Sequence, residues 1–248
     1  MTELQGLIET DRLVTLSING SESLFWDGVA NIYTSAIVWI PLALFAILLL
    51  IRNINPKRLL LVLLLVAVTV LLCDQLSSSV CKPLFHRLRP TRDPYILNMV
   101  DTVNGYRGGL YGFFSGHAAN SFGLASLFMW LVRDRWFSLS VGIWAIINSL
   151  IRTYLGVHFA GDILVGAIVG SIIGSLMYWI YYMTTRKDRS RRNVHDSSLL
   201  YTRTGFMRTD VFAFMCVLFG TYSVIFIGSC ITQGIDERST FGAFKGYQ

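Results

Sequence analysis

Six apolar stretches, separated by polar segments, dominate this sequence of 248 residues and most constrain its fold. A transmembrane helix needs about 17–25 predominantly apolar residues. Hydrophobic residues make up 53% of the chain and charged residues only 15%, which is too apolar for a soluble domain of this size. We therefore predict an all-α fold, a polytopic membrane helical bundle of about six transmembrane helices, over residues 31–51, 59–80, 115–132, 136–154, 160–182 and 211–232.

The segment before these stretches has a different pattern. Residues 3–18 place leucine and isoleucine among acidic side chains, which predicts an amphipathic helix lying at the membrane surface. The chain then divides into an amphipathic N-terminal segment (1–27), a six-helix transmembrane domain (28–233) and a polar C-terminal tail (234–248). No basic stretch followed by a short apolar run and a cleavage site opens the chain, so we expect no cleaved signal peptide.

The distribution of lysine and arginine predicts the orientation in the membrane. The segments 52–58, 133–135 and 185–209 fall on one side and carry twelve of these residues, against nine on the other side. The positive-inside rule places these three segments in the cytoplasm, and 185–209 reads as an exposed loop or short surface helix. The segments 82–114 and 152–162 then lie outside, which predicts a cell (inner) membrane protein with these two segments at the periplasm or cell exterior. The net charge of +6 reflects this topology, and no basic stripe interleaved with aromatic residues indicates nucleic-acid binding.

Several small residues favour structural roles. Gly166, Gly170 and Gly174 repeat at spacing four and predict a helix face on which another helix packs closely. The cysteines show no metal-ligand spacing and are interpreted as small apolar residues. Two of them, Cys81 and Cys230, fall on the same predicted side, which leaves a disulfide open.

The first chemically suggestive motif is KPLFHRLRP, residues 82–90. Lys82 and Arg89 offer two cations about two helical turns apart, able to converge on one anion. The alternative is a basic cluster that touches lipid headgroups.

The second motif is FSGH, residues 114–117, where a helix begins. Ser115 can cap the helix, and the free N–H groups of its first turn form an anion site. Gly116 allows an oxygen to approach the backbone, and His117 would stand beside a bound phosphate. The alternative is a capping serine followed by an interfacial histidine.

The third motif lies in residues 148–162. The planar guanidinium group of Arg152 can bind two phosphate oxygens at once. His158 can attack phosphorus if it is neutral, and Asp162, four residues on, can orient the imidazole and stabilise the cation formed. The alternative is a snorkelling arginine at a polar helix junction.

In order and spacing, these three motifs resemble the signatures of the type 2 phosphatidic acid phosphatase family, which also includes vanadium haloperoxidases. The family patterns are K-x6-R-P, P-S-G-H and S-R-x5-H-x3-D, and the resemblance spans residues 82–162. Phe114 stands where the family usually has proline, and Ile151 where it has serine.

The resemblance implies a metal-independent membrane phosphatase without a cofactor. It makes His158 the nucleophile that forms a phosphohistidine, Asp162 its orienting partner, and His117 the general acid. The phosphate-binding residues it implies are Lys82, Arg89, Ser115, Gly116 and Arg152.

The implied substrate is a lipid phosphate: undecaprenyl diphosphate or a lipid A phosphate, ahead of phosphatidylglycerol phosphate. The segment 106–113 and the amphipathic N-terminus are expected to shape the lipid entrance. Two alternatives stay open. One is a vanadate-dependent haloperoxidase, which six apolar spans oppose. The other is a transporter or non-catalytic protein that binds lipid phosphate, which the complete set of His117, His158 and Asp162 opposes.

Overall fold

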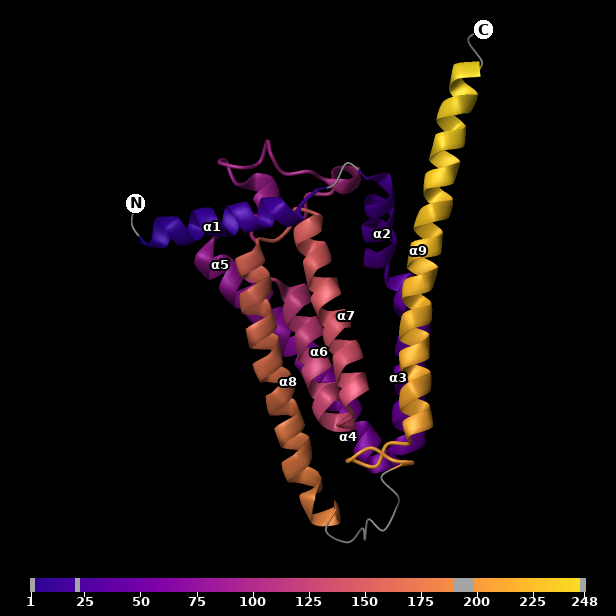
Figure 1. Cartoon of the computed structure of the whole chain (residues 1–248). Helices are drawn as coiled ribbons and strands as arrows, with labels where there is room; N and C mark the ends of the chain where they lie inside the picture. The colour runs from indigo at the N-terminus through magenta and orange to yellow at the C-terminus, as the bar shows by residue number, and fades with distance from the viewer. Residues whose placement is uncertain (1–2, 21–22, 190–198, 246–248) are drawn as a thin grey trace.

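The computed structural model describes residues 3–20, 23–189 and 199–245, and within these ranges the chain is helical, with turns, loops and isolated bridges between the helices (Figure 1). Four helical segments are long and apolar enough to cross a membrane: Ala36–Asn53, Pro56–Phe85, Ala160–Arg186 and Arg208–Thr232. The predicted all-α membrane fold is therefore confirmed. The count of six spans remains a prediction, because α6 (Gly116–Val132) and α7 (Arg135–Tyr154) are not among these four.

The centre of the bundle is the pair formed by α6 and α8 (Ala160–Arg189). Glycine permits their close approach: a Cβ on Gly170 would collide with the backbone carbonyl of Ala119, and one on Gly174 with that of Gly123. The glycine face predicted for 166–174 is thus a helix-packing seam. It fixes the first turns of α6 and α8 beside each other.

The first predicted span, 31–51, begins later than expected. Helix α2 (Leu24–Thr34) ends before Ser35, which has an extended backbone. The short helix η1 (Ala36–Trp39) and α3 (Ile40–Asn53) follow it. Pro41 lies in the first turn of α3, where its missing N–H has no intrahelical partner to lose. The apolar run is therefore divided among α2, η1 and α3, and the break at Ser35 precedes the proline.

The second span changes its helical winding at its polar end. Helix α4 (Pro56–Gln75) continues into η2 (Leu76–Cys81), a π-helical turn, and then into α5 (Lys82–Phe85). Ser77 in η2 is fully buried and donates to the Phe114 carbonyl at 2.7 Å. At the polar end of this span, Ser77 thus faces protein, whereas Asp74, Gln75, Ser78 and Ser79 are exposed.

Helix α9 (Arg208–Lys245) extends beyond the predicted span 211–232, so residues 234–245 of the expected tail belong to it. Residues 190–198 of the predicted cytoplasmic segment, which include His195, lie outside the described residues. All four cysteines have free thiols.

The apolar core lies toward the end of the bundle where α6 ends and α7 and α9 begin (Figure 1). Its members include Leu49, Leu131, Phe137 and Leu218, each almost fully buried. Many other large apolar side chains of the spans point outward, as expected for helices surrounded by lipid. Polar residues gather at the opposite end.

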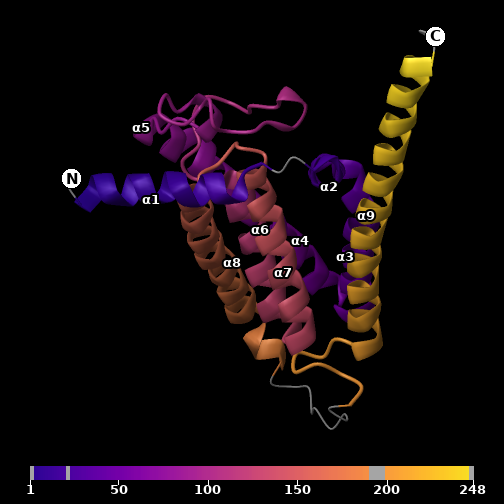
Figure 2. The ribbon, with the colours of Figure 1, turned by 45° about the horizontal axis from the view of Figure 1, so that its top comes forward.

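Helix α1 (Glu3–Ile18) lies across that opposite end, at a steep angle to α8 (Figures 1 and 2). Leu4, Leu7 and Leu13 are more than 60% exposed, which suits a helix that rests on a membrane surface. The loop between α5 and α6, with the short helices η3 (Pro90–Arg92) and η4 (Val103–Gly105), covers the same end (Figure 2). Together, α1 and this loop enclose the starts of α6 and α8.

Candidate active site

The three motifs meet around one cavity of about 150 Å³ beneath this cover. Residues from α4, α5, α6, α7 and two loops line it. Six are predicted site residues, and four were not assigned a role from the sequence. The lining residues are Lys82, Arg89, Gly116, His117, Arg152 and His158, with Asp74, Tyr106, Asn120 and Val157.

Arg89 is fixed at the cavity by backbone acceptors. Its Nε donates to the Tyr111 carbonyl at 3.2 Å and its Nη1 to the Val157 carbonyl at 3.1 Å. Gly108 has φ +63°, and a Cβ there would lie 2.7 Å from Nη1 of Arg89. Since both acceptors are neutral carbonyls, these bonds orient the guanidinium and leave its positive charge in place.

The second motif forms the start of α6 as predicted. Ser115 is the N-cap, and its Oγ accepts from the Ala118 amide at 3.4 Å. Ser115 is fully buried and lies behind the cavity wall, whereas Gly116 and His117 line the cavity. The first turn of α6 therefore presents its backbone and an imidazole to the cavity, while the serine hydroxyl supports the helix end.

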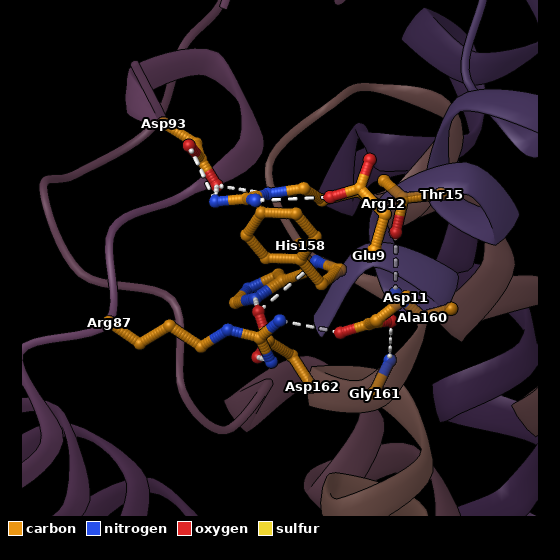
Figure 3. Close-up of polar contacts among 11 residues, drawn as sticks. Glu9, Asp11, Arg12, Thr15, Arg87, Asp93, His158, Ala160, Gly161 and Asp162 are labelled. Carbon is orange, nitrogen blue, oxygen red and sulfur yellow. Dashed lines mark hydrogen bonds and ion pairs between the residues drawn. The ribbon is translucent and has the colours of Figure 1, made fainter. Parts of the chain in front are cut away.

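The third motif places His158 in the loop between α7 and α8. Its imidazole is 3% exposed, and Nδ1 lies 3.5 Å from Oδ2 of the fully buried Asp162. This pairing is long for a hydrogen bond, as catalytic pairs often are without substrate. Nδ1 faces Asp162 (Figure 3), so Nε2 is the ring nitrogen left for the cavity that His158 lines.

Burial lowers the pKa of His158 below its ordinary value, and Arg89 and Lys82 act in the same direction against the opposing effect of Asp162. The imidazole is therefore neutral near pH 7, the form that can act as a nucleophile. Asp162 also accepts from the Phe159 amide at 3.1 Å and from Nη1 of Arg87 at 2.8 Å.

The cavity has the charge balance of an anion site. Lys82, Arg89 and Arg152 line it against one carboxylate, Asp74. Asn120 adds an amide oxygen that has no hydrogen-bond partner within the described residues. Such a set of cations suits the oxygens of a phosphoryl group and the charge that develops on them during transfer.

The two departures from the family pattern lie outside the cavity wall. Ile151 packs against the apolar cluster of Val29, Tyr33 and Ile225, so this position joins α7 to α2 and α9. Phe114 is 2% exposed and packs with Cys73 and Ala119. Both side chains serve packing between helices.

Some contributing residues were missed by sequence reasoning. Asp74 lies outside the three motifs, and Asn120 lies one helical turn after His117, a spacing that could have indicated it. Arg87 lies inside the first motif but was treated as a spacer. Its contact with Asp162 joins residues 75 apart, which sequence spacing does not reveal. Tyr106 belongs to the segment expected to shape the lipid entrance, and it does line the cavity.

His86, which was assigned no role, is the residue after α5 and packs edge-on against Tyr111, with 4.9 Å between ring centroids. It is exposed and is not among the residues that line the cavity.

Comparison with known proteins shows the family of this chain. Residues 58–186 match the PAP2 superfamily. The "Lipid A 4'-phosphatase" of Bacteroides thetaiotaomicron is 38% identical over 75% of this chain and 84% of that protein. The "Lipid A 4'-phosphatase" of Porphyromonas gingivalis is 34% identical over 72% of this chain and 75% of that protein.

The crystal structure of the first transmembrane PAP2 type phosphatidylglycerolphosphate phosphatase from Bacillus subtilis is 20% identical, with a TM-score of 0.49, over 79% of this chain and 90% of that one. The superfamily match covers more than half of the chain, and both relatives exceed 30% identity. The chain therefore belongs to the PAP2 superfamily, and it is a multi-pass membrane phosphatase.

Proposed function

We propose that this protein removes the 4'-phosphate of lipid A through a phosphohistidine at His158. The observation that carries this proposal is the convergence of Lys82, Arg89, His117, Arg152 and His158 on one cavity at the end of a membrane bundle. The two relatives named for lipid A 4'-phosphatase activity support the choice of substrate over undecaprenyl diphosphate and phosphatidylglycerol phosphate.

The first chemical step is attack by His158. The Nε2 lone pair forms a bond to phosphorus, and the bond between phosphorus and the sugar oxygen of the lipid breaks. His117, which is protonated when the phosphate dianion is bound beside it, gives its proton to that leaving oxygen. Asp162 holds the imidazole and stabilises its positive charge, while Lys82, Arg89 and Arg152 stabilise charge on the phosphoryl oxygens. The product is the dephosphorylated lipid and a phosphohistidine.

The second step uses water. His117, now neutral, takes a proton from a water molecule whose oxygen attacks phosphorus. The phosphorus–nitrogen bond breaks, and its electron pair returns to Nε2 of His158. Inorganic phosphate leaves, and both histidines regain their starting protonation states. Protein cations perform the charge stabilisation that a metal ion performs in other phosphatases, so this mechanism requires no metal.

The direct test measures inorganic phosphate released by purified protein from lipid A, undecaprenyl diphosphate and phosphatidylglycerol phosphate, with EDTA present. We expect lipid A to be the best substrate, and mass-spectrometric fragmentation of the product to show loss of the 4'-phosphate. Faster release from another lipid, or loss of the 1-phosphate, would contradict the substrate assignment. Binding of lipid A without phosphate release would favour a non-catalytic lipid-phosphate-binding protein.

His158→Ala tests the mechanism, and we expect it to abolish phosphate release. His86→Ala is the matched control, because His86 is a histidine at the same end of the bundle whose side chain does not line the cavity. Wild-type turnover by the His158 variant would refute nucleophilic attack by this residue.

We also propose that the cavity faces the periplasm, based on the lysine and arginine distribution. The test uses single cysteines in a variant without the four native ones. Tyr95→Cys lies on the cavity side and Leu199→Cys at the other end of the bundle, and both positions are more than 75% exposed. In cells with a permeable outer membrane, a membrane-impermeant maleimide should label position 95 only. Labelling of position 199 alone would reverse the orientation.

A further inference from the structure

Helix α1 binds the start of α8 through two side chains, Asp11 and Thr15. Oδ1 of Asp11 accepts from the Gly161 amide at 2.7 Å, and its Oδ2 accepts from Nη2 of Arg87 at 2.5 Å (Figure 3). One turn further along α1, Oγ1 of Thr15 accepts from the Ala160 amide at 3.0 Å. Two side chains of α1 thus satisfy backbone donors of the first turn of α8, which its own helix leaves unpaired. The bonded residues lie directly between His158 and Asp162 in the sequence.

Arg87 connects Asp11 to the carboxylate beside the nucleophile. While Nη2 binds Asp11, Nη1 donates to Oδ1 of Asp162 at 2.8 Å. The guanidinium also lies over the Phe159 ring, 4.2 Å from its centroid. With one oxygen of Asp162 bound to Arg87, the other is directed to the Phe159 amide and to the imidazole of His158.

We propose that Arg87 and Asp11 are positioning residues, which fix the orientation of Asp162 and thereby of His158. Helix α1 then completes the catalytic site although it contributes no group to the cavity wall. This inference rests on the proposed function, because it assumes that His158 is the nucleophile.

The packing around both carboxylates supports a fixed geometry. A Cβ at Gly161 would lie 2.8 Å from Oδ2 of Asp11, and one at Gly112 would lie 2.9 Å from Oδ2 of Asp162. A larger residue at either glycine would therefore collide with the neighbouring carboxylate. Asp162 is fully buried, and the side chains of Asp11 and Arg87 are 17% and 27% exposed, so water screens these charges only in part.

The pair also acts on the electrostatic balance at His158, through the contact of Arg87 with Asp162. The charged and titratable groups that act on this imidazole are Asp162 from α8, Lys82 from α5, Arg89 from the loop and His117 from α6. Removing the Arg87 cation leaves the Asp162 carboxylate less compensated, so protonated His158 is stabilised and its pKa rises. Removing the Asp11 anion has the opposite effect, so the pKa of His158 falls.

The test compares Arg87→Gln and Asp11→Asn with the wild-type protein in phosphate release. We expect each to lower kcat about tenfold to hundredfold, as for a lost charged hydrogen bond, with KM changed less than about threefold. The acid limb of the pH profile should move to higher pH in Arg87→Gln and to lower pH in Asp11→Asn. The double variant should be no slower than the slower single variant, because both changes break one chain of contacts.

Arg12→Gln is the matched control. Arg12 also joins α1 to the loop over the cavity, through Asp93 at 3.0 Å, but it does not contact Asp162. We expect its kcat and pH profile to stay near those of the wild type. Equal losses in Arg12→Gln and Asp11→Asn would reduce the role of Asp11 to the docking of α1 and overturn the proposal.

Two further outcomes separate this inference from the proposed function. If the wild type releases phosphate and both variants keep its kcat and acid limb, the positioning role is wrong while the phosphatase mechanism stands. If the wild type releases none, the proposed function itself fails. Should Arg87→Gln not fold, Arg87→Lys replaces it. The ammonium group of lysine cannot reproduce the paired contacts of the guanidinium with Asp11 and Asp162. Wild-type kcat in Arg87→Lys would therefore overturn the proposal.

Discussion

Replacement of Asp162 by asparagine tests the role of the buried carboxylate beside the nucleophile. The change preserves the size of the side chain and removes its charge. Attack on phosphorus places a positive charge on His158, whose Nδ1 lies 3.5 Å from Oδ2 of Asp162. At an effective dielectric constant of about 20, two unit charges at that distance interact by about 5 kcal/mol. The loss should be smaller, because Arg87 already compensates part of the carboxylate charge.

We therefore expect Asp162→Asn to lower kcat about hundredfold to thousandfold, equivalent to roughly 3–4 kcal/mol of transition-state stabilisation. The assay is inorganic phosphate release from lipid A under saturating conditions, with thermal unfolding in detergent as a test of folding. Asp93→Asn is the control, since Asp93 is a buried carboxylate paired with Arg12 at the same end of the molecule. A folded Asp162→Asn protein with kcat within threefold of the wild type would refute the reasoning.

Three other perturbations test separate features. His117→Ala should slow phosphate release most for substrates with poor leaving groups, and equal slowing for a p-nitrophenyl and an alkyl phosphate would argue against general acid catalysis. Burial lowers the pKa of His158, so the neutral nucleophile should persist as pH falls. The acid limb of the kcat/KM profile should therefore lie below about pH 6.5, the ordinary pKa of histidine. An acid limb above that pH would contradict the burial argument. Gly170→Ala should lower the free energy of unfolding in an SDS titration by about 1–3 kcal/mol, because its Cβ meets the Ala119 carbonyl, whereas Gly220→Ala, with open space around it, should not.

Most of the fold could be predicted from the sequence, because a bilayer fixes the length of an apolar helix. The observed α6 and α7 begin and end within one residue of the predicted 115–132 and 136–154, and Ser115 caps α6 as expected. The prediction of the first span, 31–51, was less accurate. Its apolar run continues through a break at Ser35, and hydropathy does not register a local change of backbone direction.

The catalytic groups were predictable to the extent that each motif has a fixed internal spacing. The residues that hold those groups were not, because their partners lie far away in the chain. Arg87 binds Asp11 across 76 positions, and Asn19 on the same side of the molecule binds the Tyr154 carbonyl across 135. Such contacts depend on how α1 lies across the bundle, a tertiary arrangement that no local pattern specifies.

The glycine seam between α6 and α8 has a consequence for how the protein responds to bilayers of different thickness. Membranes of different thickness tilt the outermost helices of a bundle. Of the described residues that line the cavity, none comes from α3 or α9, whereas His117 and His158 stand at the joined ends of the seam. We therefore expect changes in lipid composition to alter the tilt of α3 and α9 more than the distance between the imidazoles of His117 and His158.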